Sequence, residues 1–172
     1  MTNVASTSRG EQVRETAKQA FGFVPNLIDE MATHNPAVAQ TYLASNSALE
    51  DGVLSPAEQQ VVILAISTYN ECHYCTTAHA AAGAQAGVPE HVIDTILDGG
   101  LPQADRSRQL VRLTRRIAGK RGWLNDDDLS EFMDAGLGRD VVYEVVALIG
   151  VKTISNYVNH IAHTEVDPPF LT

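Results

Sequence analysis

The hydrophobic residues of this sequence recur at intervals of three and four or form short continuous runs. No segment fits the alternation of a half-buried strand better. Proline, glycine and capping residues divide the pattern into segments, and the clearest helix starts are Asn35-Pro36 and the capping box Ser55-Pro56-Ala57-Glu58. Helices are predicted at residues 11–21, 36–49, 56–69, 71–86 (with Asn70 as N-cap), 90–97, 105–120, 126–135 and 139–163. The predicted fold class is therefore all-α, as a compact multi-helix bundle.

Length and composition are those of an ordinary globular protein. The 172 residues are 44% hydrophobic and 19% charged, which suits one domain over residues 1–172 with a sizeable core. A net charge of −9 gives no electrostatic support to nucleic-acid binding. The basic residues at 106–121 alternate with Leu110, Val111, Leu113 and Ile117, which predicts a solvated helix face rather than a phosphate site.

The sequence shows no sign of export or membrane insertion. Residues 1–10 are polar and lack the apolar stretch of a secretory signal. The longest apolar runs, such as 61–66 and 145–151, are far too short to span a bilayer. We therefore expect a soluble, cytoplasmic protein with no membrane partner.

The two cysteines lie three positions apart in the segment Cys72-His73-Tyr74-Cys75-Thr76-Thr77-Ala78-His79. In a reducing cytosol this spacing indicates redox chemistry or metal binding rather than a structural disulfide. On a helix Cys72, Cys75 and His79 fall within about 60° of one another, and His79 is one turn from Cys75, near enough to exchange its proton. A helix N-terminus capped by Asn70 would favour the thiolate, which is the nucleophilic form. The second cysteine could then resolve a sulfenic acid to a disulfide.

Other interpretations of the motif must be weighed. The two cysteines could be buried and inert, or Cys72, Cys75 and His79 could bind zinc with His160 or His163 as a fourth ligand. Covalent haem attachment needs a histidine directly after the second cysteine, where this chain has Thr76. A thioredoxin fold would need a βαβ pattern, which the sequence lacks.

Several of these residues together resemble a known family. Leu54-Ser55-Pro56, the apolar helix to Asn70, the Cys-His-Tyr-Cys motif and His79 resemble the alkylhydroperoxidase D-like (AhpD-like) branch of the carboxymuconolactone decarboxylase superfamily. The core of the resemblance covers about residues 38–119, and the tail at 156–168 is similar to the peroxidase-related members. It implies a helical homo-oligomer, a trimer or a hexamer, that reduces peroxides without metal or haem. It further implies that Cys75 attacks the peroxide, Cys72 resolves it and His79 belongs to a proton relay.

The sequence departs from the family pattern at two positions. Gln60 stands where the family relay has a glutamate, and Tyr74 stands where a second histidine is common. Gln60 can hydrogen-bond His79 but cannot act as a base. Glu58 lies about 200° round the helix from Gln60, so it cannot simply replace a relay glutamate there, and a capping role suits it better. The candidate supporting members of the proton relay are Gln60, Glu58 and Tyr74. On the last helix, His160 and Asn156 could line a pocket or play a structural role.

These observations predict a cysteine-based peroxidase that acts on hydrogen peroxide or small organic hydroperoxides in antioxidant defence. A Cys72–Cys75 disulfide would be reduced by an external dithiol or thioredoxin-like protein, and no cofactor is expected. One alternative is a disulfide carrier or redox sensor with little peroxide turnover, which Gln60 makes credible. The other is a lactone decarboxylase, whose chemistry would not need the cysteine pair.

Overall fold

The computed structural model describes residues 4–171, and these residues form helices with no strand, as the sequence predicted. The helices are α1 (Val4–Phe21), α2 (Asn26–His34), α3 (Pro36–Leu49), α4 (Pro56–Tyr69), α5 (His73–Gln85), α6 (Glu90–Leu97), α7 (Asp105–Lys120), α8 (Asp126–Asp134), α9 (Arg139–Ala162) and the 3-10 turn η1 (Pro168–Phe170). The prediction of an all-α fold is confirmed.

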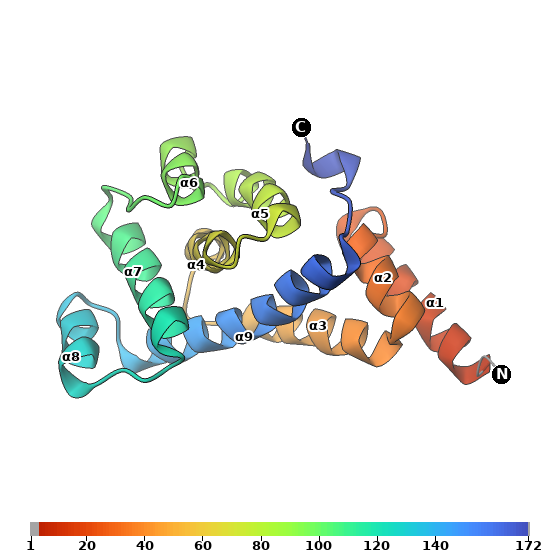
Figure 1. Cartoon of the computed structure of the whole chain (residues 1–172), viewed down its shortest axis with the longest axis horizontal. Helices are drawn as coiled ribbons and strands as arrows, with labels where there is room; N and C mark the ends of the chain where they lie inside the picture. Colours follow the sequence, from red (N-terminus) through yellow and green to blue (C-terminus); the bar gives the residue numbers. More distant parts are fainter. Residues whose placement is uncertain (1–3, 172) are drawn as a thin grey trace.

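Helix α4 lies at the centre of the fold, between α5 and α9 (Figure 1), and it also packs against α6 and α7. Its residues 61–67 are buried on every side, which explains their unbroken run of apolar and small residues. Two apolar clusters form the core, one built mainly from α4, α6, α7 and α9 and the other mainly from α1, α2, α3 and the start of α5. The two cysteines belong to the second cluster, where α5 meets α9.

The N-caps that the sequence predicted at Asn35 and Ser55 are confirmed. Both halves of the box between Ser55 and Glu58 form at the start of α4, and Asn35 accepts the Ala37 N–H at the start of α3. Asn125 caps α8 in the same reciprocal way as Ser55 caps α4. Each of these caps satisfies backbone donors that the first helical turn would leave unpaired.

The prediction that Asn70 is the N-cap of the motif helix is wrong. Asn70 is the C-cap of α4, and Glu71 follows in the left-handed region at φ 56°. The chain then turns so sharply that Cys72 itself is the N-cap of α5, and its N–H donates to Ser67 O at 3.0 Å. Asn70 is an amide that can end one helix as well as begin the next, and the local sequence did not distinguish these roles.

Helix α2 was not predicted, and its N-terminus shows why. The N-cap is Pro25, which makes no side-chain capping bond. Instead the Asn26 N–H donates to both carboxylate oxygens of Asp167, at 3.1 and 3.2 Å, from 141 positions along the chain. The capping group of α2 is therefore supplied by the C-terminal segment, and no pattern near residue 26 could reveal it.

Helix α9 is the one described helix that is long and apolar enough to cross a membrane by length and composition. Half of its most apolar window is buried inside the protein. Its buried face also carries Lys152, Asn156 and Asn159, whose side chains bond to other helices. These are the contacts of a core helix.

Candidate functional site

The site is built around two buried thiols at the start of α5. Cys72 is the N-cap residue and Cys75 is the third residue of the helix, and their exposures are only 1% and 2%. The N-terminus of α5 places unpaired N–H groups and the positive end of the helix dipole close to both sulfur atoms. The part of the prediction that put the thiols at a helix N-terminus is therefore confirmed, although with a different cap.

A polar stripe on α9 faces the two thiols. The Asn159 amide Nδ2 lies 3.3 Å from Cys75 Sγ and 3.9 Å from Cys72 Sγ. Ser155 Oγ lies 3.8 Å from Cys75 Sγ, and the Asn156 carbonyl oxygen lies 4.0 Å from Cys72 Sγ. An amide N–H aimed at sulfur suits a thiolate, because it donates to the charged form.

A chain of hydrogen bonds runs past the thiols from α3 to α4. The buried Lys152 Nζ lies 2.9 Å from Tyr42 Oη and 3.0 Å from His79 Nε2, and His79 Nδ1 lies 2.9 Å from Gln60 Oε1. Since the lysine can only donate, His79 Nε2 accepts and His79 Nδ1 carries the proton that it donates to Gln60. The expected contact between Gln60 and His79 is present, and both ring nitrogens of His79 are engaged.

The electrostatics of the pair favour ionisation of Cys75. The hydrogen bond from the Cys72 thiol, the charge of Lys152 and hydrogen bonds from α9 together outweigh burial and lower the pKa of Cys75 to about 6. The interaction with Cys75 and burial raise the pKa of Cys72. Burial and the Lys152 charge hold the pKa of His79 well below its usual value, so His79 is neutral at pH 7. This arrangement favours the thiolate on Cys75 and the protonated thiol on Cys72.

Three residues that the sequence suggested for supporting roles point elsewhere. The Glu58 carboxylate is used in the α4 capping box and in an ion pair with Arg106 at 2.7 Å. Tyr74 donates its hydroxyl to Asp167 Oδ2 at 2.5 Å, which ties α5 to the C-terminal segment. His160 is exposed and stacks on Tyr157, so it does not share a pocket with the buried Asn156.

The structure gives no support to the zinc alternative. Within residues 4–171 no group of three or more histidine, cysteine, aspartate or glutamate side chains is arranged to hold a metal ion. His160 and His163, the candidate fourth ligands, are both exposed.

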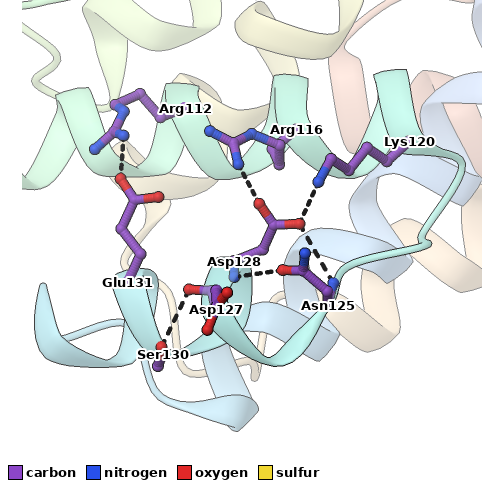
Figure 2. Close-up of polar contacts among 8 residues, drawn as sticks. All are labelled: Arg112, Arg116, Lys120, Asn125, Asp127, Asp128, Ser130 and Glu131. Carbon is purple, nitrogen blue, oxygen red and sulfur yellow. Dashed lines mark hydrogen bonds and ion pairs between the residues drawn. The ribbon is translucent and has the colours of Figure 1, made fainter.

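The basic residues of α7 contact α8. Figure 2 shows Arg112 reaching Glu131, while Arg116 and Lys120 both reach Asp128. These contacts lower the pKa of Asp128, chiefly through the hydrogen bond from Lys120. The prediction of a purely solvated face is therefore incomplete, because these charges also hold α8 against α7.

Neither of two surface pockets of about 480 Å³ opens onto the thiols. One is lined by α7 and the loop before it, and the other by α1 and α3, and neither includes Cys72, Cys75 or His79. The partly buried His79 and Gln60 are the least covered members of the hydrogen-bonded chain.

Lys152, Ser155 and Asn159 are functional-site residues that the sequence reasoning missed. With Asn156 they recur at intervals of three, one and three in a helix that is otherwise largely apolar. Such spacing places polar groups on one stripe of a helix, and a polar stripe on a core helix indicates buried partners. That periodicity was the signal that could have found them.

Comparisons with known proteins agree with the fold. Residues 36–115 match the carboxymuconolactone decarboxylase family. No curated protein matches the chain. Among solved structures, an alkylhydroperoxidase AhpD core, a peroxidase-related protein from Ralstonia eutropha JMP134, superposes with a TM-score of 0.82 at 21% identity. The match covers 95% of this chain and 87% of that one.

Two further structures share the fold. A peroxidase-related protein from Silicibacter sp. TM1040 has a TM-score of 0.77 at 17% identity, over 95% of this chain and 87% of its own. The debrominase Bmp8, in complex with 2,3,4-tribromopyrrole, has a TM-score of 0.74 at 12% identity, over 98% of this chain and 91% of its own. Residues 36–115 thus match the carboxymuconolactone decarboxylase family model, and the chain shares its fold with the alkylhydroperoxidase AhpD core and with the second peroxidase-related structure.

Proposed function

We propose that this protein is a thiol-dependent peroxidase that reduces small hydroperoxides and cycles through a Cys72–Cys75 disulfide. The observation that carries the proposal is the pair of buried thiols at the start of α5, in which the Asn159 amide lies closer to Cys75 Sγ than to Cys72 Sγ, at 3.3 and 3.9 Å. This asymmetry agrees in direction with a lowered pKa for Cys75 and a raised one for Cys72. A nucleophile and a resolving thiol need this difference, because only the first must be ionised before the peroxide arrives.

The chemistry balances with these two residues and an external dithiol. The Cys75 thiolate attacks one peroxide oxygen, the O–O bond breaks, and the leaving alkoxide takes a proton to give an alcohol or water. Cys75 is then a sulfenic acid, and the Cys72 sulfur displaces its hydroxyl as water to form the disulfide. A dithiol donor returns two electrons and two protons by thiol–disulfide exchange.

The burial of the thiols supports a small oxidant. Both sulfur atoms lie in residues that are at least 98% buried, and neither surface pocket reaches them. Hydrogen peroxide or a short alkyl hydroperoxide needs the least opening of the structure. An electron donor as large as a thioredoxin-like protein needs the start of α5 to open after the disulfide has formed.

The test is peroxide consumption in the presence of several dithiol donors. We expect turnover by the wild type, none by Cys75→Ser, and a single turnover ending in a trapped sulfenic acid for Cys72→Ser. His73→Ala is the matched control, because His73 is exposed at the first position of the same helix. The disulfide itself appears as a loss of two hydrogens by intact mass, restored by dithiothreitol.

The same assay separates the rival functions. A reversible disulfide without peroxide turnover with any donor would contradict the proposal in favour of a carrier or sensor. Activity on a lactone that survives the loss of both cysteines would indicate decarboxylation.

We also propose that the protein forms a homo-oligomer in the cytoplasm. Exposed apolar side chains at Tyr143, Val146, Tyr157 and Ile161 follow one face of α9, which would suit a contact between copies.

A further inference from the structure

Lys152 is a buried cation whose described partners are all neutral. Its exposure is 1%, and its Nζ is bonded to the Tyr42 hydroxyl and to His79. The ammonium also lies 5.1 Å from the centre of the Tyr42 ring. Among the described ion pairs, none gives Lys152 a carboxylate. A buried ammonium without an anion carries a large desolvation penalty, so the arrangement calls for a negative charge nearby.

One candidate for that charge is the sulfur of Cys75, whose pKa the Lys152 charge lowers. Lys152 lies on the same stripe of α9 as Ser155 and Asn159, which both approach Cys75 Sγ, and its partner His79 lies one turn after Cys75 on α5. We propose that Lys152 is the positioning residue that supplies the counter-ion of the Cys75 thiolate, so that the reduced protein holds a thiolate–ammonium pair that the disulfide form lacks. The inference deepens the proposed function, since it concerns the same thiols.

The other titratable groups around Cys75 do not offer an equivalent charge. Cys72 donates to the thiolate, and His79 is neutral with both ring nitrogens engaged. Tyr42, on α3, faces the ammonium through its hydroxyl. Asp167, beside η1, is held by the hydroxyl of Tyr74 and by a backbone N–H of α2. Helix α4 contributes the neutral Gln60, since its Glu58 is committed to the helix cap.

This pairing has a consequence for the redox equilibrium. At neutral pH, oxidation of the pair removes two electrons and releases one proton, from Cys72, because Cys75 is already ionised. The electrons and that proton, with one proton from water, convert one molecule of glutathione disulfide to two of glutathione. Whatever stabilises the thiolate stabilises the reduced protein, so Lys152 makes the disulfide easier to reduce.

The experiment measures Cys75 alkylation against pH in a Cys72→Ser background, where one thiol reacts. An opposite charge nearby typically shifts a pKa by about 1 to 3 units. In Lys152→Met we expect the pH midpoint of Cys75 alkylation to rise by at least one unit. At a pH below the midpoint, the alkylation rate should fall about tenfold for each unit of that rise. Lys152→Arg should restore most of the effect, and Tyr42→Phe, which removes a neutral partner and leaves the charge, should move the midpoint much less. If Lys152→Met does not fold, Lys152→Gln provides the same test.

The second readout is the equilibrium of the disulfide with glutathione at pH 7, in protein with both cysteines. Lys152→Met should lower the equilibrium constant for reduction by the factor by which the protonated fraction of Cys75 rises at that pH. A shift in neither the midpoint nor this constant, in a folded variant, would overturn the proposal. Unchanged thiol chemistry in Lys152→Met, with normal wild-type turnover, would reject the ion pair but keep the peroxidase. The expected shifts in a protein that shows no peroxide turnover would support the ion pair and reject the peroxidase.

Gln60→Glu distinguishes this pairing from a proton relay. A carboxylate at position 60 would lie on the His79 side of the ammonium and compete with the thiolate for its charge. We therefore expect Gln60→Glu to raise the alkylation midpoint of Cys75, whereas restoring a relay base would lower it. A lowered midpoint in this variant would contradict the pairing.

Discussion

Asn159 offers a test of how much one hydrogen bond contributes to the thiolate. Its amide nitrogen lies 3.3 Å from Cys75 Sγ, while its Oδ1 is buried and has no hydrogen-bond partner in the described structure. A hydrogen bond to a charged group is worth about 1.5 to 3 kcal/mol, and one pKa unit corresponds to about 1.4 kcal/mol. Asn159→Leu, which keeps a similar volume and removes the donor, should therefore raise the pKa of Cys75 by about 1 to 2 units.

The stability of this variant should respond differently from its thiol. Because the oxygen of Asn159 is already unpaired, removal of the whole amide leaves no new buried group unsatisfied. In the oxidised protein, which holds no thiolate, the free energy of unfolding should change by less than about 1 kcal/mol.

Alkylation against pH and urea denaturation of the oxidised protein measure the two quantities. The matched control is Asn46→Leu, since the Asn46 amide bonds to a backbone carbonyl within α3, away from the sulfur atoms. An unchanged alkylation midpoint in folded Asn159→Leu would refute the role of this amide. A large loss of stability in the oxidised form would show that Asn159 serves packing instead.

Three further predictions test other parts of the structure. The free energy of unfolding of the reduced protein, relative to Cys75→Ser, should rise between pH 6 and about 8.5 and become independent of pH below pH 6. The reason is that the folded pKa of Cys75, about 6, lies below the unfolded value of about 8.5; a flat difference in urea titrations would contradict the lowered pKa. Glu144→Ala should lower the free energy of unfolding by about 2 to 4 kcal/mol, because the carboxylate accepts two backbone N–H groups of the loop before α4. The control Glu11→Ala, at an exposed position, should change the free energy of unfolding by less than about 0.5 kcal/mol in the same thermal or urea measurement. Light scattering should give a multiple of 18.6 kDa that Ile161→Glu reduces; a wild-type monomer at micromolar concentration would rule out the oligomer.

The sequence predicted those elements whose signals lie within a few residues. The capping box at Ser55 and the asparagine caps of α3 and α8 determine where their helices begin through bonds to the first turn. Helix α2 was missed because its capping carboxylate, Asp167, comes from the other end of the chain. The misassigned Asn70 is a subtler case: Glu71 adopts a left-handed conformation that glycine ordinarily occupies, so nothing in its identity marked the sharp turn.

In the candidate site, too, the sequence predicted the contacts within one helix but not those between helices. Cys72, Cys75 and His79 could be grouped from spacing because they belong to one helix and its cap. The hydrogen-bonded network around them comes from three other helices: Gln60 from α4 bonds to His79, the polar stripe of α9 contacts the sulfur atoms and His79, and Tyr42 from α3 bonds to Lys152 of that stripe. Residue spacing within one helix cannot specify which helix will pack against it, so these contacts had to come from the structure.

The polar stripe of α9 also links the fold to the chemistry. Burying a lysine, a serine and two asparagines in a helix core is unfavourable unless each finds a partner. Here the partners are the thiols, His79, Tyr42 and the amide of Asn70, which donates to Asn156 Oδ1 at 2.8 Å. An apolar replacement of the whole stripe could keep the helices packed, and such replacements are often neutral or stabilising for buried ionic groups. The stripe is therefore better explained by what it does to the sulfur atoms than by what it adds to stability. The hydrogen bond from Cys72 and then the charge of Lys152 oppose the burial that would raise the pKa of Cys75.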